Sequence, residues 1–597
     1  MPIYQFCSVN KIVSFMIRNL LFTLVFILFL FGCGDSHEVL QLRSVQGGRF
    51  FGGTLHLSKT EYIHTLYPPA IIDPISARVA SQIYEGLFYI APDDFSVRPL
   101  LVESFEINQD STVYTFRLKK GVYFHDDPCF PTGKGRELKA SDVEYCFTQL
   151  CQQTESNQGF VLFKGILKNI DSYHEASGKK NKTSTRAPEA IQVLDDYSIR
   201  LILEKPYSQL LIQLARPQAL IYPREEIYKY GTKRAKAVGT GPFVLLDVER
   251  FISIRLERNP RYHRYDAAGN RLPYLDGIYF QFIPDKRSEL AEFKSGNLQM
   301  MYHLPPEQFT QILRMESDGT KPPEWRNALL VHKPELVTHY LAFNLQNSFF
   351  KNHSLRKAFA HSLDKTTILG TTLSGEGLAP ATYGITPPLF KNYPTTQIKG
   401  LAESLDSARQ YLSNAPLPDT KPNLAFYPDG SRNTSVAIAV AEQIKNALGI
   451  EINLDPQPLT KLYDNLLASN FDIVLLPKTT EYYKPISFLE PFYGKNTISS
   501  HGKTYPNFFH YQNALFDEGY AKALTARTET ETATALRQAE QILINDAAII
   551  PLWYDEGYYL LKKNVKNFSV NTMVLRNFTE VYFVPEAAPD KKNNKPE

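Results

Sequence analysis

The chain has 597 residues, more than a single hydrophobic core accommodates, so two or three domains are expected. An apolar fraction of 43% and a charged fraction of 21% are typical of a folded, water-soluble protein. The net charge is only +3 and no basic stripe is present, which argues against nucleic-acid binding. The aromatic fraction of 13% is high, and it fits either core packing or a ligand site lined by rings.

Residues 1–33 are predicted to be a lipoprotein signal peptide. Lys11 and Arg18 precede an apolar run over 20–31, which has the length of a signal-peptide core and is short for a permanent membrane span. The run leads into Leu-Phe-Gly-Cys, which resembles a lipoprotein processing site. Cys33 would then be acylated and would anchor the mature chain to the membrane. An ordinary secretory signal with an incidental cysteine, or an uncleaved anchor, is the alternative.

The segment after the signal is polar and rich in glycine, and 34–52 is predicted to be a tether. A short alternating strand is expected over 53–58. A helix is expected over 76–88, because its apolar residues recur on one face. That helix ends in the phrase Tyr-Glu-Gly-Leu-Phe, 84–88.

The clearest pattern in the chain lies at 113–147. Apolar and polar residues alternate over 113–118, which predicts a half-buried strand, and a second short strand is predicted over 122–124. His125 and the aspartate after it are interpreted as a polar turn rather than a catalytic or metal-binding pair. Ser141 opens a Ser-x-x-Glu capping box, which predicts the start of a helix.

This segment reads Y-T-F-R-L-K-K-G-V-x-F-H-D, followed by L-x-A-x-D-V-x-x-x-F. It closely resembles the signature of the bacterial extracellular solute-binding proteins of the oligopeptide/dipeptide type, family 5. These proteins are the receptors that feed peptide-importing ABC transporters. Further phrases that resemble the family occur in order between Thr54 and Phe583, among them G-T-G-P-F at 239–243 and N-P-R-Y at 259–262. The glycine-rich phrase lacks the residues of a nucleotide-binding loop.

The resemblance implies an α/β, two-lobed periplasmic binding protein type II fold with an additional small α+β domain. The expected divisions are lobe I over 53–98, 235–335 and 555–585, the accessory domain over 99–234, lobe II over 336–554, and a disordered tail over 586–597.

The remaining elements come from periodicity and turn residues. A hairpin is predicted over 191–203, and a helix over 436–448 that Gly449 closes. Alternating strands and helices over 423–477 predict a largely parallel sheet. A final strand over 549–554 resembles the family's strand that crosses back between the lobes.

Three cysteines, Cys129, Cys146 and Cys151, follow the leader. They have no C-x-x-C spacing, so neither a zinc site nor a redox motif is indicated. In an oxidising compartment Cys129 can pair with either of the other two, and the sequence does not decide between them. No cofactor and no metal are predicted.

The ligand site is expected in the loop after a strand over 471–476. In oligopeptide-binding relatives this loop resembles A-D-Y-x-x-P-x-x-F-L, and its Asp holds the α-ammonium group of the ligand. Alignment on the Pro and the Phe-Leu pair places Glu481 at that Asp, Tyr482 at the Tyr and Thr480 at the small residue before the Asp, with Tyr483 as a second aromatic wall.

Physical chemistry supports a carboxylate here, because an ammonium group buried without a counter-charge is costly. Main-chain pairing with an extended peptide then gives affinity without reading side chains. Two departures from the relatives are visible. Glu481 is one methylene longer than Asp, and Lys478 stands where the relatives carry an aromatic residue.

The function inferred from the sequence is that of a lipid-anchored, monomeric receptor in the periplasm or on the outer face of the envelope. It is expected to capture extended oligopeptides by hinge closure and to deliver them to an ABC permease. No catalytic constellation is visible, so an enzyme is not predicted. The alternatives are the same fold binding a metal chelate, haem or a sugar, and a surface adhesion or signalling lipoprotein.

Overall fold

The computed structural model of the protein describes residues 41–179, 187–233, 236–317, 319, 325, 327–415, 420–573 and 576–585. The predicted signal peptide with Cys33 and the predicted tail over 586–597 lie outside these residues. In the part of the chain that is described, none of the helices combines the length and the apolar character that a membrane span requires.

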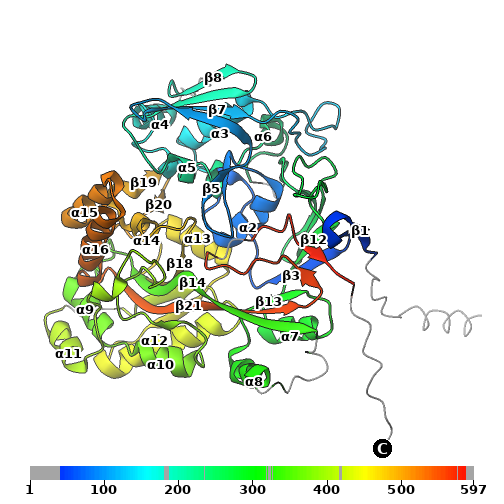
Figure 1. The fold of residues 1–597 in the computed structure, drawn as a ribbon. Coiled ribbons are helices and arrows are strands. Elements are labelled where there is room, and N and C mark those ends of the chain that lie inside the picture. Colours follow the sequence, from blue (N-terminus) through cyan, green and yellow to red (C-terminus); the bar gives the residue numbers. More distant parts are fainter. Residues whose placement is uncertain are drawn as a thin grey trace, which may run out of the picture. The chain divides into compact units, whose positions relative to one another are not determined.

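A mixed sheet of eleven strands runs through the described residues (Figure 1). In spatial order its strands are β10 (Phe243–Glu249), β11 (Ser253–Arg258), β12 (Gly277–Phe282), β3 (Thr54–Lys59), β13 (Met300–Tyr302), β21 (Ile549–Lys562), β14 (Ala328–Phe343), β18 (Ile473–Thr479), β16 (Asn423–Phe426) and β17 (Asn453–Pro456), with β15 (Ala379–Pro380) beside β21. Within this sheet of described residues, the parallel pairs are β12 with β3, β3 with β13, β18 with β16, and β16 with β17. The strands within 423–477, β16, β17 and β18, are parallel as predicted, but β14, β15 and β21 add antiparallel pairings, so the sheet of the predicted second lobe as a whole is mixed.

The strands β14 and β21 are long enough to serve both halves of this sheet. The portion 328–334 of β14 pairs with β21 on the side of β13, whereas 338–343 lies between β21 and β18. Their register shifts between Pro334 and Thr338, so the ladder is interrupted in its middle. Because such irregularities bend a strand, we expect both strands to bend at this point.

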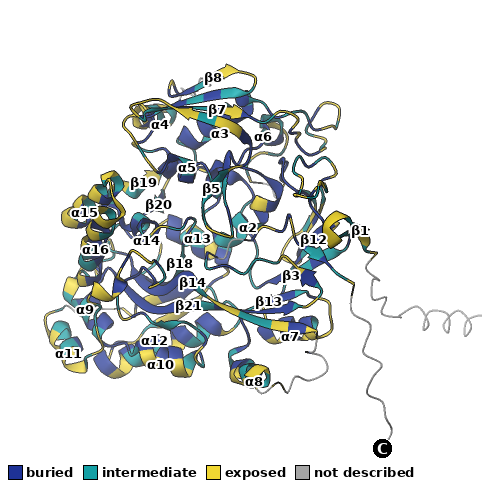
Figure 2. Cartoon of the chain, in the orientation of Figure 1, coloured by how far each residue is buried: buried dark blue, intermediate teal, exposed yellow. Residues whose placement is uncertain are grey.

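Helices cover both faces of the sheet because successive side chains of a strand point to opposite sides. From β14, Leu341 and Phe343 enter one apolar cluster, while Tyr340 and Ala342 enter the other. Figure 2 shows these central strands buried beneath more exposed helices. The helices around the sheet are α2 (Pro74–Ile83), α7 (Lys286–Lys294), α8 (Pro306–Ser317), α9 (His353–His361), α10 (Lys365–Thr367), α11 (Leu405–Ser413), α12 (Arg432–Leu448), α13 (Leu459–Leu467), α14 (Ile486–Leu489), α15 (Ala514–Thr525) and α16 (Glu529–Asn545).

A second, antiparallel sheet of four strands forms the small α+β part. It consists of β6 (Val102–Ile107), β7 (Val113–Leu118), β9 (Ser198–Ile202) and β8 (Ile191–Asp195), in that order, with α3 (Ala140–Cys151), α4 (Ile170–Ser177), α5 (Leu210–Gln213) and α6 (Arg224–Tyr230). Helix α3 packs on β8 and β9. The described residues add four two-stranded sheets, β1 (Arg43–Val45) with β2 (Arg49–Phe51), β4 (Phe88–Ile90) with β5 (Val97–Pro99), β19 (Thr497–Ser500) with β20 (Lys503–Pro506), and β22 (Val565–Lys566) with β23 (Tyr582–Phe583).

Several predicted elements are confirmed. The strand over 113–118 is β7, and the hairpin over 191–203 is β8 with β9. The helix predicted from 436 starts earlier, at Arg432, and ends where expected, because Gly449 adopts the left-handed conformation with φ of 69°. The final strand begins at Ile549 as predicted but continues to Lys562.

Other boundaries were wrong for local reasons. The helix expected over 76–88 stops at Ile83, because Tyr84 is extended. The strand expected over 122–124 makes only an isolated bridge from Tyr123. Helix α3 begins before Ser141, and its capping carboxylate is that of Asp142, which accepts the backbone N–H of Lys139 at 2.9 Å.

The predicted tether is wrong for residues 43–51. Residues 43–51 form a hairpin, and Phe51 packs on Tyr274 with ring centroids 5.5 Å apart.

All three cysteines of the described chain, Cys129, Cys146 and Cys151, are free thiols.

The signature phrases of the sequence meet at one buried carboxylate, Glu85. It accepts hydrogen bonds from Thr240 Oγ1 at 2.8 Å and Tyr262 Oη at 2.9 Å, and His263 Nε2 lies 3.0 Å away. These residues belong to the three phrases Y-E-G-L-F, G-T-G-P-F and the stretch that begins N-P-R-Y. Burial opposes the charge of Glu85, but the His263 ring outweighs it and the pKa of Glu85 is lowered.

The glycine-rich phrase is a packing turn beside this carboxylate. A Cβ on Gly239 would lie 1.9 Å from the carbonyl oxygen of Ile83, so only glycine fits there. The ring of His125 lies 3.0 Å from the carbonyl oxygen of Gly241 and is 2% exposed. Burial lowers the pKa of His125 to about 4, and its neutral ring ties the segment over 113–147 to this turn. His125 is therefore a buried packing residue, and the segment 124–127 is irregular where a polar turn was expected.

Replacement of Glu226 by glutamine is expected to reduce the loss of stability between pH 5 and pH 8. Glu226 is 3% exposed and accepts from Tyr84 Oη at 2.8 Å, and burial raises its pKa from 4.5 to about 8. The folded state therefore holds more protons than the unfolded state between these values, so stability falls as pH rises through that window. The effect is on the order of a few kcal/mol, and melting temperatures at both pH values measure it.

The neighbouring Glu225 offers a control of opposite sign. Burial acts against its charge, but Arg136 donates to it at 2.8 Å and lowers its pKa below 4.5. A depressed folded pKa stabilises the protein above the unfolded pKa and loses that contribution in acid. Glu225→Gln should therefore cost stability at pH 8, where Glu226→Gln gains it relative to wild type. Identical pH profiles for the two variants would refute the assignment.

Candidate ligand-binding pocket

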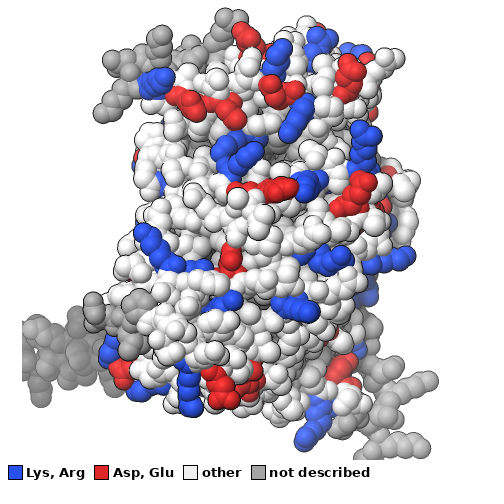
Figure 3. Space-filling view, turned by 90° about the vertical axis from the view of Figure 1, so that its left-hand side faces the viewer, with Lys and Arg blue, Asp and Glu red and all other residues white. Residues whose placement is uncertain are grey.

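A cavity of about 400 Å³ lies among the described residues, and its volume is within the range of small-molecule sites. Its wall is built from the end of β3, helix α2, the turn around Arg216, the middle of β14, the loop after β18, and Met573 with residues from 576–579. The segment 113–147 contributes nothing to this wall, whereas Glu85, Pro242 and Tyr262 of the other family phrases line it. On the face shown in Figure 3, acidic and basic side chains are interspersed.

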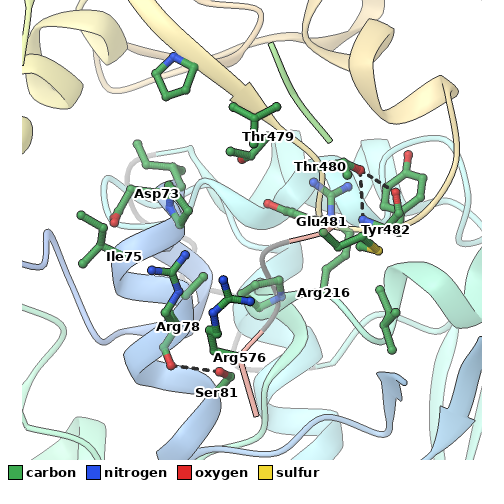
Figure 4. A pocket seen from close by; sticks show the side chains of 18 of the residues that line it. Asp73, Ile75, Arg78, Ser81, Arg216, Thr479, Thr480, Glu481, Tyr482 and Arg576 are labelled. Atoms are coloured by element: carbon green, nitrogen blue, oxygen red, sulfur yellow. Dashed lines mark hydrogen bonds and ion pairs between the residues drawn. The ribbon is translucent and has the colours of Figure 1, made fainter. Parts of the chain in front are cut away.

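Three of the four predicted ligand residues, Thr480, Glu481 and Tyr482, line the cavity. They follow β18, where the strand ends and the chain turns (Figure 4). The hydroxyl of Thr480 is used within its own loop, because it lies 2.6 Å from Ser487 Oγ and accepts the N–H of Tyr482. Thr480 therefore shapes the loop.

Tyr483, the second predicted wall, does not line the cavity. Its ring stacks on Phe95 with centroids 4.9 Å apart and packs near Phe390, and its hydroxyl donates to the carbonyl of Leu389 at 3.0 Å. Apolar packing of the ring against these partners holds it away from the ligand space.

Arg216 is the central residue at this end of the pocket, and sequence reasoning missed it. Its guanidinium donates from Nε to Glu481 and from Nη1 to Glu490, the latter at 2.8 Å. The Arg216 side chain is 4% exposed, against 30% for Glu481 and 13% for Glu490. Burial lowers the pKa of Arg216, but the two carboxylates outweigh it and raise that pKa well above its usual value.

Lys478 is the second cation near these carboxylates. Burial lowers its pKa to about 8, against the attraction of Glu490 and Glu481. The two cations, Arg216 and Lys478, balance the two carboxylates. The side chain of Glu481 is more exposed than those of Glu490 and Arg216. An incoming ammonium group can therefore share the carboxylate of Glu481 with a guanidinium that is already in place.

A buried ionic network forms part of the cavity wall, where the ladder of β14 and β21 is interrupted. Asp555 receives two hydrogen bonds from Arg432, at 2.7 and 3.1 Å, and lies 2.9 Å from His339 Nε2. His303 Nδ1 lies 3.0 Å from Glu376. Burial opposes the charge of Asp555, but Arg432 and His339 outweigh it and hold its pKa well below 3.8. No cluster of metal-ligating side chains occurs among the described residues.

These features define a class of protein. One sheet whose two halves share β14 and β21, helices on both faces and a charged cavity are the architecture of a two-lobed solute-binding protein. The sequence model of the bacterial extracellular solute-binding proteins, family 5 (middle), matches residues 96–500. The chain belongs to this family, which confirms the resemblance seen in the sequence. Its fold is the periplasmic binding protein type II fold with an additional small α+β domain.

Similar proteins span nearly the whole chain. It is 27% identical over 530 residues to the periplasmic oligopeptide-binding protein OppA of Salmonella typhimurium, which covers 86% of this chain and 90% of that protein. It is 25% identical to heme-binding protein A of Haemophilus influenzae, over 84% of this chain and 87% of the relative. The structure of the periplasmic binding protein DppA from Helicobacter pylori, in complex with the peptide STSA, matches with a TM-score of 0.77 at 21% identity, covering 90% of this chain and 98% of that one.

Proposed function

We propose that this protein binds oligopeptides in its cavity and delivers them to an ABC import permease. The carrying observation is the arrangement of Glu481 and Glu490 around Arg216 at the end of β18, at the wall of a cavity of about 400 Å³. A partly exposed carboxylate in that place is a counter-charge for a peptide amine. The oligopeptide-binding relative from Salmonella typhimurium supports the same ligand class.

We infer that binding closes the protein about the middle of β14 and β21. The predicted lobe boundaries, after 335 and after 554, fall within these two strands. The register shift between Pro334 and Thr338 supports flexing there. The boundaries 53–98, 235–335 and 555–585 for lobe I, 99–234 for the accessory domain and 336–554 for lobe II are kept as part of this proposal.

We also propose that the mature protein is a lipid-anchored monomer at the outer face of a membrane. The apolar run over 20–31 and the phrase ending in Cys33 support this. The intact mass of the protein extracted from membranes measures it. A mature chain that starts at Cys33 and carries acyl chains is expected, and a chain without lipid contradicts the anchor.

Glu481→Gln is expected to weaken peptides with a free amine about 10- to 100-fold, the loss of one charge-assisted hydrogen bond. The same peptides with an acetylated amine should be affected much less, because they bring no ammonium group to the carboxylate. Calorimetric titration of tri- to pentapeptides measures both. Glu442→Gln, at an exposed position on α12, is the surface control. Equal losses for free and acetylated peptides would disprove the ammonium role, and an absence of binding across a diverse peptide set would disprove the function.

A non-peptide solute such as haem is the second candidate ligand. It is favoured by the similarity to a heme-binding protein and by Lys478, which stands where the peptide-binding relatives carry an aromatic residue. Mass spectrometry of the material that co-purifies with the protein separates the two. A mixture of short peptides supports the first function. Haem or another non-peptide solute in stoichiometric amount favours the second.

A further inference from the structure

We propose that Lys59, Arg78 and Arg576 form an anion subsite that holds a carboxylate group of the bound ligand. The proposal rests on the proposed function, in that it specifies which peptides the cavity prefers. It concerns a wall of the pocket that is formed by different segments from those around Glu481.

The three cations converge from distant parts of the chain. Lys59 is the last residue of β3, Arg78 lies on α2, and Arg576 comes from the C-terminal segment. All three line the cavity. Figure 4 shows the guanidinium groups of Arg78 and Arg576 next to each other and directed into the open space that Glu481 also faces. The two guanidinium groups also repel each other: burial lowers the pKa of Arg78, and the charge of Arg576 lowers it further.

Two of these cations have no acceptor among the described residues. Lys59 is 8% exposed, and neither its ammonium group nor the guanidinium of Arg78 makes a hydrogen bond or an ion pair there. Burial, and then repulsion from Arg78 and Arg576, lowers the pKa of Lys59 well below 10.5. A buried cation without an acceptor is costly, so an anion that enters the cavity would supply the missing acceptor and be bound favourably.

The nearby carboxylates are already committed to other partners. Glu289 accepts Lys286 Nζ at 2.7 Å and the hydroxyl of Ser58. Glu335 accepts Tyr302 Oη at 2.7 Å and the hydroxyl of Tyr559, and it lies outside the cavity wall. The positive charge of Lys59 and Arg78 is therefore left for a ligand, while Arg576 also donates to Tyr559 Oη and to the carbonyl of Ser569.

A carboxylate suits this geometry best among the groups of a peptide. Arginine recognises a carboxylate through paired N–H donors, and a lysine beside it adds a point charge. The carboxylate has two possible sources, the C-terminal α-carboxylate of the peptide or an acidic side chain. With an amine directed toward Glu481, either source would give the ligand opposite charges on the two walls.

Calorimetric titration separates these sources. A neutral tetrapeptide is compared as the free acid and as the C-terminal amide, which reports on the α-carboxylate. The amide is then compared with glutamate or glutamine at each position, which reports on a side-chain carboxylate. Wild type is expected to prefer a charged member of at least one pair by tenfold or more. Arg78→Gln and Lys59→Met should each reduce that preference about tenfold, whereas the exposed control Arg255→Gln should retain it.

Preference unchanged in both pocket variants overturns the subsite while leaving peptide binding intact. A wild type that binds no peptide overturns the proposed function instead, and the subsite is then judged without peptide. In the ligand-free protein, Lys59→Met should raise the melting temperature, because a buried cation without an acceptor is removed. Succinate should stabilise wild type more than this variant. A lower melting temperature of the variant, or an equal response to succinate, overturns the subsite.

Discussion

Replacement of Asp555 by asparagine is expected to lower the free energy of unfolding by about 3–5 kcal/mol, the cost of removing one partner from a buried ion pair. Asp555 is 1% exposed, and its loss leaves Arg432 and His339 buried without their shared carboxylate. The network lies where the pairing of β14 and β21 is interrupted, so few backbone hydrogen bonds hold the two strands together if the ion pairs are lost. Urea unfolding followed by circular dichroism measures the change.

The pH dependence gives this prediction a second signature. The folded pKa of Asp555 is depressed, so its contribution is complete above the unfolded value of about 3.8 and is lost as pH falls through the folded value. The deficit of the variant should therefore be constant from pH 5 to pH 7 and shrink in stronger acid. Asp93→Asn is the matched control, because Asp93 pairs with Arg98 at the surface and is 65% exposed. A deficit no larger than that of the control contradicts the prediction.

The sequence predicted the scaffold well because its signals are local or recurrent. Alternation defined β7, and a glycine that tolerates positive φ defined the end of α12. The family phrases converge on one buried carboxylate: Thr240 and Tyr262 each donate a hydrogen bond to Glu85, across 155 and 177 residues of chain. These phrases therefore point to the fold through its internal packing.

The pocket was harder to predict because its charged residues come from distant segments and leave no local signal. The alignment singled out Glu481, which lines the cavity, but its partner Arg216 lies 265 residues away and belongs to no motif. Arg78 shares its helix with apolar positions that periodicity explains, and nothing marks its guanidinium as facing a cavity. Long-range charge pairing leaves no trace in local periodicity, so only the folded arrangement could have revealed these cations.

Arg216→Met is expected to destabilise the protein by about 3–5 kcal/mol and to change how ligands stabilise it. The variant leaves the carboxylates of Glu481 and Glu490 without the guanidinium that joins them. A peptide with a free amine brings a cation to the same place. Its addition should therefore raise the melting temperature of the variant more than that of wild type, whereas an acetylated peptide should shift both by similar amounts.

Arg216→Lys tests whether charge alone accounts for the effect. Lysine keeps the positive charge but lacks the planar fork that lets Nε and Nη1 reach two carboxylates and Gln213 at once. It should recover part of the stability and leave a smaller excess of stabilisation by free-amine peptides. If Arg216→Met is as stable as wild type, the turn around Arg216 and the loop after β18 are held by other contacts. If the free and acetylated peptides stabilise the variant equally, the ligand amine does not bind beside Glu481, and the ammonium site must be sought elsewhere along the wall.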